Sequence, residues 1–163
     1  GHLFAANRLV VIVPAENPSG VRVFADLAQP GVQLVLAAPG VPIREYSEDI
    51  LEMAAVDPAF TAGFREAVLS NLASEEDNVR QVVLKVALNE ADAGIVYESD
   101  VTVDVVEQVM VIEIPDAYNV TATYPIAILR DARQPEAARD FIAFVRSGEG
   151  QMILQRHGFA PVE

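Results

Sequence analysis

The sequence has 163 residues, of which 52% are hydrophobic and 21% are charged. This composition is typical of one folded domain with its own core, and it excludes an intrinsically disordered chain. The formal net charge is −13, with 24 acidic residues against 11 basic ones, so we expect no nucleic-acid surface and no anionic membrane surface, which both require clustered Lys and Arg.

Cysteine is absent, which excludes thiol catalysis, disulfide bonds and thiolate metal sites. His2 and His157 lie far apart and lack the spacing of a metal-ligand pair. No apolar run reaches the length of a membrane span, and no signal peptide is visible. The chain enters a strand almost at once, so we expect it to begin partway through a larger protein.

The first part of the chain alternates apolar runs with turns. Residues 8–14, RLVVIVP, predict a buried strand, and the Asn, Pro, Ser and Gly of residues 15–21 predict a turn. Residues 23–31 predict a short helix that ends at a Pro-Gly pair. Residues 32–38, VQLVLAA, then predict a second buried strand.

The middle of the chain predicts helices. Residues 41–56 carry apolar side chains at helical spacing, and Pro42 occupies a position where helices commonly begin. Residues 58–73 predict a second helix. A third is predicted by an apolar stripe at i, i+3, i+4, i+7 and i+8, formed by Val79, Val82, Val83, Val86 and Ala87.

The last part of the chain returns to strands and ends in helices. Residues 93–97, 109–114 and 122–129 predict three strands, and residues 134–147 and 148–158 predict two helices. Strands that alternate with helices indicate an α/β fold with a mostly parallel sheet flanked by helices.

The segment SEEDNVRQV, residues 74–82, raises the question of a ligand site. Ser74 followed by Asp77 resembles a capping box, and Asp77 can itself be an N-cap, so the acids would only stabilise the start of a helix. Alternatively, the first residues inside the cap, Asn78 and Val79, direct free backbone N–H groups at an anion. Spacing alone favours the structural interpretation.

Two further positions are open in the same way. With Pro42 at the first helical position, the N–H of Ile43 is an unpaired donor, although a plain strand-to-helix turn is the simpler explanation. Tyr97 ends a predicted strand, where its hydroxyl either contacts water or donates into the crevice in which α/β proteins bind ligands. No nucleophile–base pair is visible, so we do not expect an enzyme.

Together, these segments resemble a known family. The substrate-binding proteins of bacterial molybdate ABC importers, which are type II periplasmic binding proteins, are similar to this chain over nearly its whole length. EDNVRQV…ALNEADAGIVYESD is the most specific part of the resemblance, and NRLVVIVP…NPSGV and YPIAIL add to it. FVRSGEGQMILQRHGF is shared more widely and supports the superfamily rather than the ligand.

The resemblance implies a solute-binding component of an ABC importer that holds molybdate or tungstate with neutral donors and without a cofactor. By position, the second-lobe donors would be the N–H of Ile43, the N–H of Val79 and the hydroxyl of Tyr97. The importer permease would be its partner, and the full-length protein would be periplasmic or otherwise extracytoplasmic and membrane-associated. The supporting helix start would comprise Ser74, Asp77 and Asn78.

The chain departs from this family in two respects. The family's first lobe, with its serine-bearing segments, has no counterpart here. Ile43 and Arg44 stand where small residues are expected, and the isoleucine would narrow the pocket. The resemblance therefore assigns residues 1–122 to the second lobe with hinge strands, and residues 123–163 to C-terminal helices that would pack on a first lobe. Strands 8–14 and 122–129 would lie side by side.

Three alternatives remain open on the sequence. The anion is molybdate or tungstate on the leading hypothesis, and sulfate or an organic acid on the second. On the third, this lobe is an interaction module without a ligand of its own. Since the helices of residues 123–163 would expose apolar side chains in the absence of a first lobe, we also expect homo-oligomers.

Overall fold

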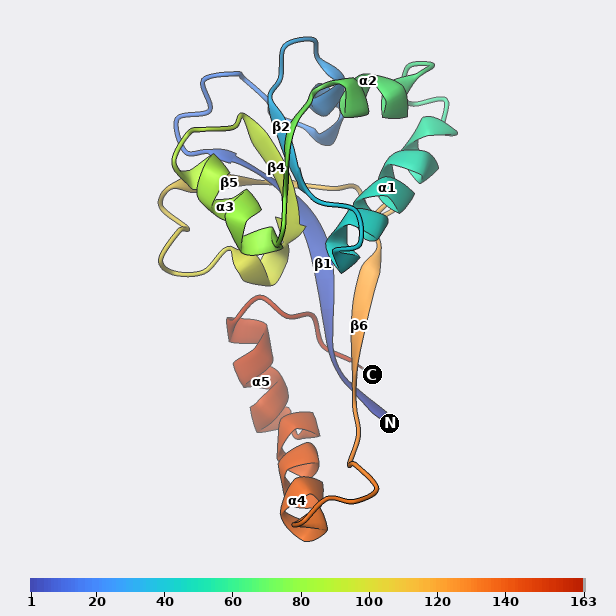
Figure 1. Cartoon of the computed structure of the whole chain (residues 1–163), viewed down its shortest axis with the longest axis vertical. Helices are drawn as coiled ribbons and strands as arrows, with labels where there is room; N and C mark the ends of the chain where they lie inside the picture. Colours follow the sequence, from blue (N-terminus) through green and yellow to red (C-terminus); the bar gives the residue numbers. More distant parts are fainter. Residues whose placement is uncertain (163) are drawn as a thin grey trace. The chain divides into compact units, whose positions relative to one another are not determined.

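The computed structural model describes residues 1–162, and the predicted α/β fold is confirmed (Figure 1). The chain divides into two units, of which unit 1 comprises Gly1–Arg8 with Thr121–Glu163 and unit 2 comprises Leu9–Val120. Strand β1 (His2–Pro14) contributes its first seven residues to unit 1 and the remainder to unit 2.

The sheet of unit 2 has the strand order β3-β2-β4-β1-β5 (Figure 1). Strand β2 runs parallel to β3 and β4, whereas β1 runs antiparallel to β4 and β5. The sheet is therefore mixed, and the expectation of a mostly parallel sheet is wrong, because apolar runs predict buried strands but not their direction. The bounds are β2 (Leu34–Ala37), β3 (Leu72–Glu76), β4 (Ala93–Tyr97) and β5 (Val109–Glu113).

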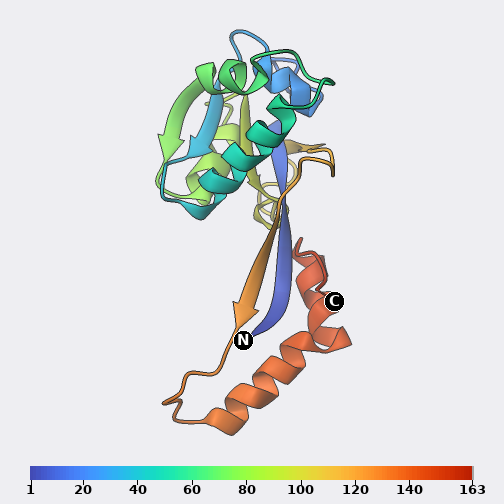
Figure 2. The same cartoon turned by 90° about the vertical axis from the view of Figure 1, so that its right-hand side faces the viewer.

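Two helices cover opposite faces of this sheet: α1 (Pro42–Ala55) and α3 (Val79–Ala87). In Figure 1 they lie on the two sides of β2 and β4, and in Figure 2 α1 passes in front of the strands. The chain passes from β2 to its neighbour β3 through α1, and then in the opposite direction from β3 to β4 through α3. Because both crossovers between parallel strands are right-handed, opposite directions place the two helices on opposite faces of the sheet. The apolar stripe of α3 packs on β4, where a Cβ on Gly94 would lie 2.8 Å from Cγ1 of Val82.

The prediction of a helix over residues 58–73 is largely wrong. The helix α2 is short (Phe64–Ser70), and Gly63 precedes it at φ +77°, a left-handed conformation that suits glycine. Residues Leu72–Glu76 form β3 instead. This strand is polar because it lies at the edge of the sheet, where its side chains alternate between half-buried and exposed. The segment at 23–31 contains a 3₁₀ helix, η1 (Phe24–Ala28).

Unit 1 is built from both ends of the chain. Strand β6 (Thr121–Ile126) pairs antiparallel with β1, from His2 opposite Ile126 to Arg8 opposite Thr121. Strands β1 and β6 are therefore neighbours, as predicted, but the predicted bounds are wrong. Residues 2–8 of β1 pair with β6, and residues 10–14 pair with β5. The predicted C-terminal helices are α4 (Pro135–Arg146) and α5 (Gly148–Arg156), visible in Figure 2.

The chain beyond α5 returns to β1. Ala6 and Ala160 exchange two backbone hydrogen bonds, of 3.2 and 2.8 Å, in an antiparallel bridge. The assignment of residues 123–163 to a surface that packs on another lobe stays a prediction. Among residues 1–162, no helix has the length and apolarity that crossing a membrane requires.

Candidate functional site

The three predicted donors follow the carboxyl ends of three adjacent parallel strands. Ile43 lies in the first turn of α1 after β2, Val79 begins α3 after β3, and Tyr97 is the last residue of β4. Since β2 pairs in parallel with both β3 and β4, these carboxyl ends share one edge of the sheet, which is where α/β proteins bind ligands. Their convergence on a single concavity stays a prediction.

Ile43 contributes to the core as well as to the helix start. Pro42 is the first residue of α1, as expected, so the N–H of Ile43 has no carbonyl one turn back in the helix. The side chain of Ile43 is 1% exposed and packs in the core of unit 2. The expectation that it narrows a pocket is therefore wrong, because the side chain points inward and leaves only the backbone at the sheet edge.

Asn78 caps helix α3. Its side-chain Oδ1 accepts a hydrogen bond of 3.1 Å from the N–H of Gln81, and Val79 is the first helical residue. The predicted capping roles of Ser74 and Asp77 are wrong, because β3 extends to Glu76 and keeps Ser74 in the strand. Asn78 was expected inside the first turn of the helix, but it is the N-cap, the residue directly before the first helical residue.

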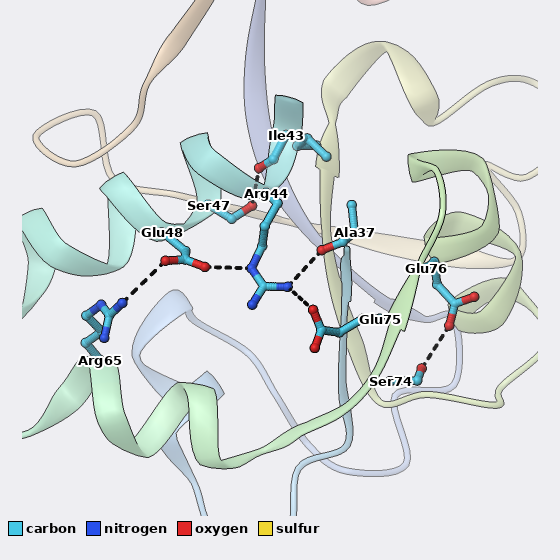
Figure 3. Close-up of polar contacts among 9 residues, drawn as sticks. All are labelled: Ala37, Ile43, Arg44, Ser47, Glu48, Arg65, Ser74, Glu75 and Glu76. Atoms are coloured by element: carbon cyan, nitrogen blue, oxygen red, sulfur yellow. Dashed lines mark hydrogen bonds and ion pairs between the residues drawn. The ribbon is translucent and has the colours of Figure 1, made fainter. Parts of the chain in front are cut away.

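Ser74 takes part in a contact that joins β3 to α3. Its hydroxyl donates to Glu76 at 2.9 Å (Figure 3) and accepts from Nζ of Lys85 at 3.1 Å. Lys85 also lies 2.6 Å from the Glu76 carboxylate and lowers the pKa of Glu76 below its usual value. These contacts hold α3 against β3, and the side chains of Ser74, Glu76 and Lys85 bind one another.

Arg44 lies at the edge of the candidate site, and the sequence did not reveal its contact with Glu75. Its Nη1 donates to the carbonyl of Ala37 at 2.9 Å and to Glu75 at 2.6 Å, and its Nε donates to Glu48 at 2.8 Å (Figure 3). Burial alone lowers the pKa of Arg44, but the bonds and charges of Glu75 and Glu48 outweigh it and raise that pKa. Two carboxylates thus compensate this cation at the carboxyl end of β2.

The surroundings of Arg44 are unfavourable for an anion. A hollow of about 410 Å³ beside the start of α1 is lined by Arg44 together with four acids. Their charges would repel a dianion from this side of the helix. The four acids are Glu45, Glu48, Asp49 and Glu52.

Tyr97 is half-buried and fixed through its backbone. Its N–H donates to Oδ2 of Asp100 at 3.0 Å. Burial raises the pKa of Asp100, although this hydrogen bond and the charge of Arg80 act in the opposite direction. A hollow of about 420 Å³ contains Asp100, Asp104 and Arg80, so acids outnumber the one cation there and the hollow does not favour an anion.

The side chains of this chain do not form a site for a free metal ion within the part that the structure describes. Among residues 1–162, no group of three His, Asp or Glu side chains is arranged to hold a metal ion. The candidate donors that follow these strands would be backbone N–H groups and a hydroxyl, which suit the oxygens of an anion.

Three comparisons place the chain among known proteins. The profile of a family described as "Bacterial extracellular solute-binding protein" matches residues 2–160. The "Molybdate-binding protein ModA" of Mycobacterium tuberculosis (strain ATCC 25618 / H37Rv) is 36% identical over 157 residues, which are 96% of this chain and 55% of that protein. The "Putative ABC transporter substrate-binding lipoprotein YvgL" of Bacillus subtilis (strain 168) is 26% identical over 154 residues, 94% of this chain and 55% of that protein.

A solved structure has the same fold. The substrate binding domain of a putative molybdenum ABC transporter from Clostridium difficile superposes with a TM-score of 0.80 at 24% identity. The match covers 99% of this chain and 66% of that one. The chain thus spans about half the length of the curated relatives that it matches.

Proposed function

Because the chain belongs to the bacterial extracellular solute-binding protein family, which is not a family of enzymes, we propose that it is the oxyanion-binding second lobe of an ABC importer's solute-binding protein. The observation that carries the proposal is the placement of Ile43, Val79 and Tyr97 after three adjacent parallel strands. The 36% identity with a molybdate-binding protein supports molybdate or tungstate as the ligand.

The chemistry of these donors suits a tetrahedral dianion. The N–H groups of Ile43 and Val79 carry the partial positive charge of two helix starts, and the Tyr97 hydroxyl adds a neutral donor. A neutral shell binds an anion without the cost of burying a counter-charge. The net charge of −13 is compatible with binding, because distant surface charges are screened by salt over about 10 Å.

A lobe on its own gives the anion only part of a shell. With donors from one side, the dianion keeps much of its water, and each N–H or O–H competes with that water for little net gain. We therefore propose that this chain alone binds its anion weakly. In a longer protein, a second lobe would complete the shell and exclude solvent.

The second candidate function is self-association. Unit 1 carries a groove of about 340 Å³ lined only by apolar residues and glycine, among them Phe4, Ile126, Phe141, Phe144, Ile153 and Leu154. Phe141 is 59% exposed and Phe144 is 45% exposed, although both are large apolar side chains. In a longer protein we propose that another lobe covers this groove, and in this chain by itself that a second copy does.

The ligand class and the cellular setting are parts of the same proposal. Sulfate has the shape and charge of molybdate, and an organic acid also presents anionic oxygens, so the donors do not by themselves distinguish these anions. The permease of an ABC importer would be the protein partner. The location would be extracytoplasmic and membrane-associated, which the similarity to a substrate-binding lipoprotein supports.

Calorimetric titration of the 163-residue chain with molybdate, tungstate and sulfate tests this proposal. We expect weak binding of at least one tetrahedral anion, weaker still in Tyr97→Phe, because one donor is lost. Tyr46→Phe removes a hydroxyl from the second turn of α1 and serves as the control, with unchanged binding. Equal affinity in Tyr97→Phe and the wild type would show that the Tyr97 hydroxyl is not a donor to the anion.

A further inference from the structure

The side chain of Asn119 forms two hydrogen bonds with the backbone of a single residue, Leu9. The N–H of Leu9 donates to Oδ1 of Asn119 at 3.2 Å, and Nδ2 of Asn119 donates to the carbonyl of Leu9 at 2.9 Å. This two-way exchange is the one that paired residues make in an antiparallel sheet. A side-chain amide thus takes the place of a strand residue.

The position of this contact along β1 explains why a substitute is needed. Strand β5 pairs with Val10–Pro14 of β1, and β6 pairs with His2–Arg8. Leu9 is the one residue between these two ladders, so neither strand supplies its backbone partner. The Asn119 amide fills this place and satisfies two buried polar groups that would otherwise lose their hydrogen bonds.

Leu9 lies opposite Tyr97 on its other side. The two residues are partners in the antiparallel pairing of β1 and β4. Because the N–H and carbonyl of Leu9 both point to Asn119, Leu9 and Tyr97 form a non-hydrogen-bonded pair, the type in which side chains approach most closely. Leu9 is fully buried, so its backbone position limits where the half-buried Tyr97 side chain lies.

The turn that presents Asn119 is anchored within unit 2. The N–H groups of Tyr118 and Asn119 both donate to the carbonyl of Pro115, at 2.9 and 3.1 Å. The Tyr118 hydroxyl donates to Asp57, and its ring meets Phe60 edge-on with centroids 5.2 Å apart. Asn119 therefore projects from a turn held by three hydrogen bonds and an aromatic contact.

We propose that Asn119 is a positioning residue for the candidate site: by holding the backbone of Leu9, it fixes the location of Tyr97. The inference rests on the proposed function, which makes the Tyr97 hydroxyl a ligand donor. Asn119 acts through Leu9 and touches no ligand. An alanine at this place would leave both backbone groups of Leu9 without partners, and an aspartate would keep an acceptor for the N–H but lose the donor to the carbonyl.

Amide hydrogen exchange and NMR spectra of the labelled chain test the inference. In Asn119→Ala we expect the Leu9 amide to exchange about tenfold faster relative to the amides of Val11 and Val13, which remain in the β5 ladder. We also expect the ring signals of Tyr97 to shift. Gln108→Ala is the control. It removes a hydrogen bond that another side-chain amide of unit 2 donates, to the carbonyl of Asp104, and it should leave the signals of Leu9 and Tyr97 unchanged.

Unchanged Tyr97 signals in Asn119→Ala would overturn the inference. Where that variant is too unstable for assignment, Asn119→Asp decides. Its carboxylate still accepts from the Leu9 N–H but meets the Leu9 carbonyl without a donor, so Leu9 shifts and the Tyr97 signals move with it. Unmoved Tyr97 signals refute the role. None of these readouts requires an anion. Failure of the wild type to bind any oxyanion would instead remove the proposed function and leave the coupling of Asn119 to Tyr97 standing.

Discussion

The guanidinium of Arg44 on α1 lies 2.6 Å from the carboxylate of Glu75 on β3, which is 31 residues away in the sequence. The same side chain bonds the carbonyl of Ala37 at the end of β2. One arginine thus joins a helix to two neighbouring strands at the sheet edge that carries the candidate donors.

Replacing Arg44 with Met should lower the free energy of unfolding by about 1.5–3 kcal/mol, the range for losing hydrogen bonds to charged groups. The cost stays below that of breaking a fully buried pair, because Glu48 and Glu75 are 37% and 40% exposed and regain water. Urea denaturation measures the change. Arg139→Met, which removes an exposed pair with Glu136 on α4, is the control and should have little effect. Equal losses in the two variants would contradict the anchoring role.

Asn78→Ala should destabilise the chain by about 1 kcal/mol, because the N–H of Gln81 loses its capping acceptor. Asp77→Ala is the matched control, one residue earlier and outside the helix, and it should change stability less. Thermal denaturation compares the two. A larger loss in Asp77→Ala would mean that Asp77 caps α3 after all.

Asp100→Asn should stabilise the chain increasingly as pH rises. Burial raises the folded pKa of Asp100, so the folded state favours the protonated acid, and this contribution is lost as pH rises through that pKa. Asparagine is neutral throughout and still accepts from the N–H of Tyr97. The stability difference between variant and wild type, followed by urea denaturation from about pH 4 upward, should therefore grow and then level off. A difference that shrinks with rising pH would show that Arg80 or the Tyr97 N–H dominates.

Self-association through unit 1 should appear in light scattering as a mass that increases with concentration. Phe141→Ser should reduce it, because this ring is among the most exposed side chains of the apolar groove. Val103→Ser is the control, since Val103 is 88% exposed but belongs to unit 2. A monomer at every concentration would exclude this second candidate function for the chain alone.

Patterns of neighbouring residues predicted much of the fold. The strand GIVY and the helix after Pro42 appear at nearly their predicted bounds, because each has a clear apolar pattern and a definite stop or start. Strand β3 was missed because LASEE is polar, and its carboxylates find their partners on α1 and α3. A strand at the sheet edge needs less apolar surface and so leaves a weaker signal.

Contacts between distant segments could not be predicted from such patterns. Arg44 with Glu48 has helical i, i+4 spacing and was detectable, but Glu75 was not. Leu9 and Asn119 are 110 residues apart, and no local feature joins them. Helix-start and strand-end positions marked the three residues as candidates, and the family resemblance assigned them as donors. The topology brings their strands together. Their common concavity depends on side-chain and loop geometry that spacing does not encode.

The central claim is that the N–H groups of Ile43 and Val79 face a bound oxyanion. Amide spectra of the labelled chain during titration with molybdate test it residue by residue, with sodium chloride at matched ionic strength as the control. The account predicts that the Ile43 and Val79 signals move together and saturate, with a dissociation constant of about 1 mM or higher for this half-shell. Signals of Ile43 and Val79 that stay at their chloride positions while molybdate moves others, or that do not move at all, would contradict it.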